Sequence, residues 1–380
     1  MNIRKISLAA ILIVLISMLC AVVYTGMSGS QYNPKTMINI NKAIAAILAY
    51  IAIIVIGPVP GELTVETKLK LSALAVFSPV VFGILLWPAV SPESPYELVS
   101  LSSGSLGFAG FIIFTAAAFL CGGLTAIVPG EFGLHASRAA VPLGISIAAV
   151  RSGFVTDATA RLSDVSQISQ TYNIFAIESF LWAVIAAAGF AGSFAARKLT
   201  NQDTGINDLK PLVKGWKQSV MAVAAITAVS MIVISILGTS PGIRDRELSA
   251  IMLQPGNGQA AFAVLAAFTL CGWAAMRYFK INYIPACIAA VILPAAIRLF
   301  AFKQEDILNL TQRYPLSFLT NPSLALTPVM IISFGMIGAV CGYWLAVLQK
   351  RNAALAGEEA AVEMANLAAR TAVGVADGKP

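Results

Sequence analysis

The chain has 380 residues, of which 58% are hydrophobic and 11% are charged, with a formal net charge of +7. Soluble globular chains are roughly 45–50% apolar and about 25% charged, so this composition excludes an ordinary soluble domain and indicates an integral membrane protein whose main partner is the lipid bilayer. The basic residues form short clusters between apolar runs and no stripe interleaved with aromatics, which argues against nucleic-acid binding.

A transmembrane helix needs about 20 apolar residues to cross a hydrocarbon core roughly 30 Å thick. The sequence therefore predicts an all-α membrane protein, a polytopic bundle of about ten transmembrane helices. The first span is expected to remain uncleaved, because its apolar run exceeds a signal-peptide h-region of about 7–15 residues. The predicted spans are 6–27, 40–59, 71–90, 105–128, 139–155, 174–196, 218–240, 259–276, 281–300 and 325–348.

The distribution of Lys and Arg predicts the orientation of these spans, since cytoplasmic loops carry the excess. With both termini in the cytoplasm, sixteen of the 25 basic residues lie inside and nine outside. Removing the doubtful span at 139–155 gives 13 against 12, which fits less well. The short loops and this bias are typical of a prokaryotic cytoplasmic membrane. No loop is long enough to bury a core of its own, so any chemistry is expected among the helices or at their ends.

The segment 139–155 is the most informative irregularity. Only residues 139–150 are cleanly apolar, and Pro142 interrupts them. We expect either a short or broken element that lines a polar cavity, or a short helix in a thinned bilayer whose arginines reach the headgroups. Under the first interpretation Arg138 and Arg151 would face an anionic ligand or pair with carboxylates nearby.

Glu178 is the acidic residue inside a clean span, where an ionisable group costs roughly 2.5–3.5 kcal/mol at the bilayer centre. It is predicted to pair with Arg151 or Arg161, to carry a proton in coupled transport, or to reach the outer headgroups. Together with Arg138 and Asp157, these residues are the candidates for a substrate or ion pathway.

The remaining patterns indicate packing rather than chemistry. The five cysteines lie in apolar runs without CxxC spacing and the chain has one histidine, so no metal site and no cofactor are predicted. Gly335, Gly338 and Gly342 are expected to allow close helix packing or to form a dimer face. The residues 349–380 form a cytoplasmic tail, in which a helix is expected to end before Gly374.

No family resemblance is evident, and three functions remain open. A permease or transporter for a small solute is favoured by the many spans, the irregular fifth segment and Glu178. A structural or assembly subunit of a larger membrane complex is favoured by the scarcity of buried charge and by the tail. An intramembrane enzyme acting on a lipid-linked substrate would need more acids and bases than this chain offers. A homo-oligomer or other membrane-complex partners are compatible with the first two functions.

Overall fold

The computed structural model describes the greater part of the chain after residue 69. The predicted spans at 6–27 and 40–59 lie outside the described residues. The described residues are 70, 73–74, 77–91, 98–102, 104–128, 133–152, 155, 165–201, 216–238, 243–244, 251–252, 257–301 and 326–376.

Within these residues the structure is helical apart from one antiparallel pair of two-residue strands. The pair β1–β2 lies between α10 and α11 and sets Ile243 opposite Met252. The elements in chain order are the π-helix η1 (Val81–Leu85), α4 (Trp87–Val90), α5 (Phe108–Ile127), α6 (Gly133–Arg151), α8 (Val165–Leu199), α10 (Trp216–Gly238), β1 (Ile243–Arg244), β2 (Ile251–Met252), α11 (Asn257–Phe279), α12 (Ile284–Ala301) and α16 (Pro328–Ala376).

Five of the described helical segments are long and apolar enough to cross a membrane, and Ile284–Arg298 is a shorter apolar helix. These six agree with the spans that the sequence predicts from 105 onward, except for 139–155. The multi-pass helical membrane protein is therefore supported, while the number of ten and the cytoplasmic termini stay predictions. The five segments are Phe108–Ile127, Gln170–Leu199, Trp216–Gly238, Gly258–Phe279 and Pro328–Val347.

The outer surface of the bundle is apolar in the way a lipid-facing surface requires. Phe180 of α8 is 68% exposed, and Met221 and Ile236 of α10 are 71% and 69% exposed. In water, contiguous exposure of such side chains would be unfavourable by about 25 cal/mol for each Å². Lipid removes that penalty, because it is as apolar as the side chains themselves.

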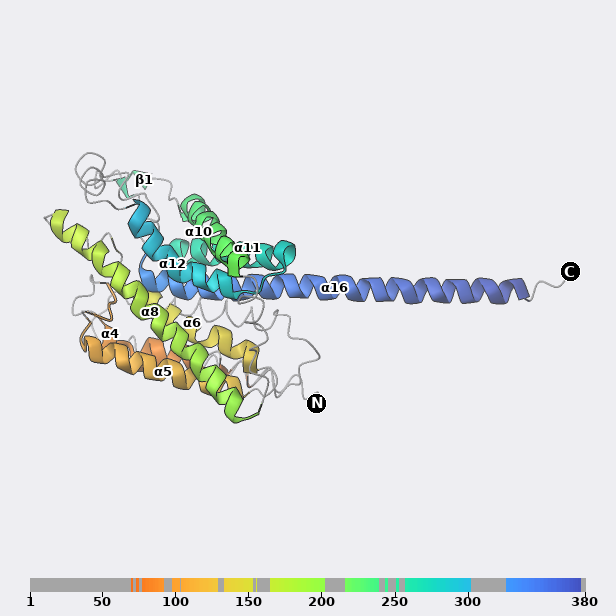
Figure 1. Ribbon diagram of the computed structural model, residues 1–380, viewed down its shortest axis with the longest axis horizontal. Coiled ribbons are helices and arrows are strands. Elements are labelled where there is room, and N and C mark those ends of the chain that lie inside the picture. Colours follow the sequence, from red (N-terminus) through yellow and green to blue (C-terminus); the bar gives the residue numbers. More distant parts are fainter. Residues whose placement is uncertain are drawn as a thin grey trace.

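The helices form two groups that meet along α6 and α16 (Figure 1). In the first group, η1 packs on α4 and α6, and α5 packs on both α6 and α8. In the second group, α11 packs closely on α16, and α10 and α12 complete the layer. Contacts of α16 with α6 and α8, and of α12 with α8, join the groups.

The closest crossing of the first group depends on glycine. A β-carbon on Gly122 of α5 would overlap the carbonyl oxygen of Gly189 in α8, and one on Gly192 would overlap the carbonyl oxygen of Phe119. In lipid, helices associate through such close packing because no hydrophobic force separates them from the solvent. The α5–α8 pair is thus held by backbone contact at two neighbouring levels.

The segment predicted as short and interrupted is a single continuous helix. Helix α6 runs through Pro142 for 19 residues, and every residue from 137 to 150 is buried. The prediction counted only uninterrupted apolar residues and so began too late. Neighbouring helices bury Ser137 and Arg138 at its start, which lets polar residues extend a helix that lipid alone would not accept.

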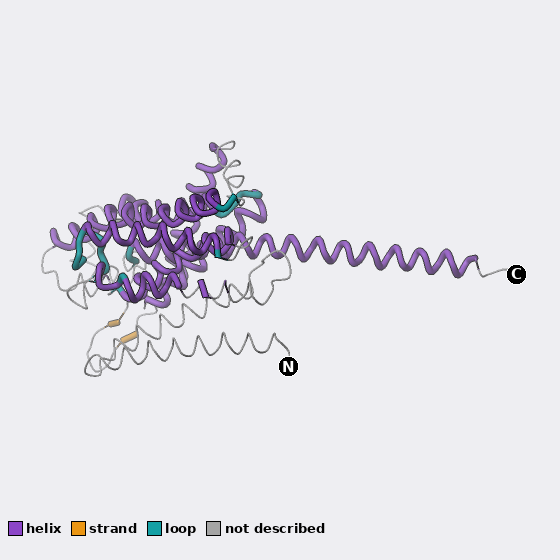
Figure 2. Tube along the Cα trace, turned by 90° about the horizontal axis from the view of Figure 1, so that it is seen from below, coloured by secondary structure: helices purple, strands orange, loops and turns teal. Residues whose placement is uncertain are grey.

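The last predicted span and the predicted tail helix are likewise one element. Helix α16 extends over 49 residues from Pro328 to Ala376, beyond the expected end before Gly374. Its first part is embedded in the bundle, and the rest projects away from it as a straight shaft (Figures 1 and 2). The intervening residues 349–359 are good helix formers apart from Asn352 and Gly357, so nothing in the sequence there ends the helix.

Candidate functional site

The carboxylate of Glu178 is bound by the loop that precedes α5. Glu178 is 3% exposed, and its Oε1 accepts hydrogen bonds from Ser100 Oγ at 2.7 Å and Ser102 Oγ at 2.8 Å. The backbone amides of Leu101 and Ser102 donate to the same oxygen at 3.0 and 2.9 Å. Successive backbone N–H groups of this kind form an anion-binding nest. We refer to residues 98–102 bound to Glu178 as the serine clasp.

The serine clasp also joins α8 to the end of α6. The amide of Val99 donates to Ser152 Oγ at 3.2 Å, and Ser152 is itself 3% exposed. Two helices of the first group are therefore bridged by one short loop. Because four donors converge on Glu178, the cost of burying its charge is offset locally, without an arginine.

Arg151, predicted as a partner of Glu178, has a different environment. Its guanidinium donates to the carbonyl oxygen of Gly83 in η1, and its Cζ lies 4.2 Å from the centre of the Trp87 ring in α4. A cation over the face of a tryptophan is attracted by the ring quadrupole. Arg151 and Glu178 do not pair with each other, and Arg151 instead fastens the end of α6 to η1 and α4.

Arg138 lies at the opposite end of α6, buried between the two helix groups. Its Cζ is 4.9 Å from the ring centre of Tyr283, the residue preceding α12. The Tyr283 ring in turn contacts the ring of Tyr343 in α16, with the centroids 5.5 Å apart. Arg138 is 5% exposed, so a charged group and two aromatic rings close this end of the junction.

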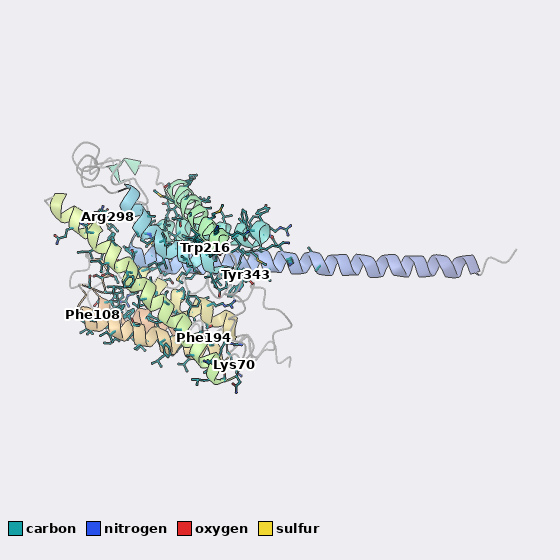
Figure 3. All side chains as sticks on the ribbon, in the orientation of Figure 1. Lys70, Phe108, Phe194, Trp216, Arg298 and Tyr343 are labelled. Carbon is teal, nitrogen blue, oxygen red and sulfur yellow. The ribbon has the colours of Figure 1, made fainter. Side chains whose placement is uncertain are left out.

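A second arginine crosses from one group to the other at the far end. Arg298 of α12 donates from Nε to Oδ1 of Asn173 in α8 at 3.0 Å, and its Nη2 donates to the same oxygen. Figure 3 places Arg298 near one end of the embedded part of α16 and Tyr343 near the other. Between these ends, the side chains of Ala139, Leu143, Ile337 and Cys341 form a buried apolar cluster.

We call this junction of α6, α8, α12 and α16 the seam. Its middle is apolar and each of its ends is crossed by an arginine. Of the predicted pathway residues, the structure brings Arg138 to the seam, whereas Arg151 and Glu178 stabilise the interior of the first group. Asp157 and Arg161 lie outside the described residues, so their predicted roles stay predictions.

The three glycines predicted to allow close packing lie against neighbours within the chain. A β-carbon on Gly342 would overlap the carbonyl oxygen of Thr269 in α11, and one on Gly338 would lie 2.5 Å from that of Leu265. Gly335 faces Ala290 and Phe268. The face that carries Gly338 and Gly342 is thus occupied by α11, where a dimer partner was the alternative.

Sequence reasoning missed the polar partners in loops and at helix ends. Ser100 and Ser102 belong to a serine-rich run at 100–105 before an apolar span, which was a usable signal for a polar contact. Asn173, Tyr283 and Trp87 gave no such signal, since each resembles an ordinary interfacial residue.

The arrangement can bind and position charged groups, and it holds no cluster that suggests a bound metal. Within the described part of the chain, no three His, Cys, Asp or Glu side chains gather where they could hold a metal ion. Comparisons with protein-family models, with curated proteins and with solved structures find no match to this chain.

Proposed function

We propose that this chain is a permease for a small solute, which crosses the membrane along the seam between the two helix groups. The observation that carries the proposal is the seam itself: an apolar middle between two helix groups, with an arginine contact from one group to the other at each end. Alternating access requires two bodies that can separate at one end while they remain closed at the other.

The contacts at the two ends are suited to opening. The Arg138–Tyr283 contact is a cation–π interaction, worth about 0.5–2 kcal/mol. The Arg298–Asn173 contact is a charge-assisted hydrogen bond, worth about 1.5–3 kcal/mol. Either can break at a cost of a few kcal/mol, which leaves the open form a minor state of about 0.1–10%. The two groups are more tightly built inside, where backbone meets backbone at Gly122 and Gly342.

The native cysteines test the proposal without knowledge of the solute. Cys341 lies in the middle of the seam, and Cys121 lies in α5 within the first group; they are 8% and 2% exposed. Two single-cysteine chains, each with the other four cysteines replaced by alanine, would be exposed in membranes to a charged, water-soluble thiol reagent. A Gly357→Cys variant of the cysteine-free chain supplies a fully accessible reference, since Gly357 faces open space.

If the seam opens to water, Cys341 reacts at about 0.1–10% of the rate at Gly357→Cys, the fraction of time for which it is open. Cys121 reacts far more slowly, because only unfolding exposes it. Equal and negligible reaction at Cys341 and Cys121 would contradict a seam that opens.

A second function, a structural or assembly subunit, is favoured by α16. The helix is embedded over 328–347, with 78% of its span window buried, and continues unbroken to Ala376. At 1.5 Å per residue, the residues after Val347 reach roughly 43 Å from the bundle. Such a shaft could transmit position from the bundle to a partner outside the membrane.

Native mass after gentle extraction distinguishes the two functions. A stoichiometric partner that is lost when the chain is cut after Gln349 would support the assembly role. A chain that has the same native mass per copy with and without residues 350–380 would contradict it. The cysteine measurement above is unaffected by the truncation, so the two results are independent.

A further inference from the structure

A crevice opens between three helices at the Arg298 end of the seam. It holds about 300 Å³ of empty space continuous with the surface. Its walls are apolar and come from Phe175 of α8, Pro294 and Ile297 of α12, and Ile331 of α16. Arg298 is the charged residue among its lining residues.

The crevice lies where three apolar segments reach their ends. The span in α8 begins at Gln170, the apolar part of α12 ends at Arg298, and the span in α16 begins at Pro328. Residues at the end of a span lie near the depth of the lipid headgroups. Tyr172, which also lines the crevice, is a residue type that favours this depth.

Arg298 is held at that level by a neighbour rather than left to move freely. Both its Nε and its Nη2 donate to the Asn173 side chain, which fixes the plane of the guanidinium beside the apolar walls (Figure 3). Arginine in a fixed orientation is well suited to phosphate oxygens, since its N–H groups match their geometry.

From this juxtaposition we propose that the crevice binds an anionic phospholipid, with an acyl chain against Phe175, Ile297 and Ile331 and the phosphate at Arg298. A cation beside an apolar wall at headgroup depth complements both parts of such a lipid. A free phosphate ion would use only the cation and would have no need of the walls. The site is independent of whether the seam conducts a solute.

The test is native mass spectrometry of the full chain released from nanodiscs of mixed phosphatidylglycerol and phosphatidylcholine. We expect the wild type to retain phosphatidylglycerol selectively and Arg298→Gln to retain about fivefold less, the factor that corresponds to about 1 kcal/mol per basic residue near an anionic lipid surface. Arg298→Lys keeps the charge and should retain an intermediate amount. Arg277→Gln, which removes an exposed arginine at the end of α11, should retain as much lipid as the wild type.

Two outcomes would overturn the proposal. The first is equal lipid retention by Arg298→Gln and Arg277→Gln. The second is release of the bound lipid by inorganic phosphate alone, which would assign the site to a free anion. The unfolding temperature of each variant in pure phosphatidylcholine nanodiscs shows whether it is folded. If Arg298→Gln is not folded, the comparison of Arg298→Lys with the wild type decides, and equal retention in those two with no preference for phosphatidylglycerol counts against the site.

Discussion

Glu178 Oε1 and Ser102 Oγ lie 2.8 Å apart, although 76 residues separate them in the chain. The serine hydroxyl is one of four donors on that oxygen, and two of the others are backbone amides. The membrane-embedded carboxylate is therefore satisfied by a loop, and it fixes where that loop ends and α5 can begin.

Replacing Glu178 with alanine should destabilise the protein. The change leaves the buried donors of Ser100 and Leu101 without an acceptor, and each such group costs about 1–3 kcal/mol. We expect a loss of about 3 kcal/mol in the free energy of unfolding, measured by denaturant titration in detergent. Ser179→Ala is the matched control, because the Ser179 hydroxyl bonds only to the Phe175 carbonyl one turn away. Equal stability of the two variants would show that the serine clasp contributes little.

The two glycines of α16 at 342 and 357 should respond oppositely to alanine. A methyl group at Gly342 would meet the Thr269 carbonyl and lie 2.7 Å from the amide nitrogen of Trp273, so α11 and α16 must move apart. We expect Gly342→Ala to cost about 1–3 kcal/mol, as overpacking does. Gly357 has open space around it, and alanine is about 0.8–1.0 kcal/mol better than glycine inside a helix.

Thermal unfolding of the full chain measures the effect at Gly342, and circular dichroism of the isolated 349–380 peptide measures the gain at Gly357. A Gly342→Ala variant that unfolds at or above the wild-type temperature would refute the close contact of α11 and α16.

Removing the hydroxyl of Ser78 should stabilise the protein. Ser78 Oγ is buried, has no hydrogen-bond partner, and faces Gly144 of α6, where a β-carbon would touch it. A buried hydroxyl without a partner costs about 1–3 kcal/mol, and Ser78→Ala removes it with little change of volume. We expect a higher unfolding temperature than the wild type. The control is Ser333→Ala, which removes a buried hydroxyl bonded to the Val329 carbonyl; a rise in both variants, or in neither, would count against this explanation.

Arg151 and Trp87 should be energetically coupled. The single variants Arg151→Gln and Trp87→Leu, with the double variant, form a cycle that isolates the pairwise interaction. From the cation–π distance of 4.2 Å we expect a coupling of about 0.5–2 kcal/mol. The free energies of unfolding of the four proteins give this value directly. Strict additivity would mean that the arginine is held by the Gly83 carbonyl alone.

The positions of the long helices could be predicted from sequence because lipid imposes a length and a composition on each span independently of the others. Residues 105–128 and 218–240 read as spans from their own side chains, and α5 and α10 lie there. The same reasoning failed for α6 because its polar residues are tolerated only where other helices bury them. No local pattern could show that Ser137 and Arg138 would be covered.

For the candidate site, the sequence singled out the ionisable residues but not their partners. Glu178, Arg138 and Arg151 were recognisable because a charge in an apolar segment is costly wherever the chain folds. Their partners were settled by tertiary structure alone, since loop 98–102, Trp87 and Tyr283 approach them only when distant helices pack. By itself the sequence determined that this chain belongs in a membrane and which segments can span it; packing between helices decided that Glu178 binds a loop, that Arg151 binds η1 and α4, and that Arg138 lies at a seam.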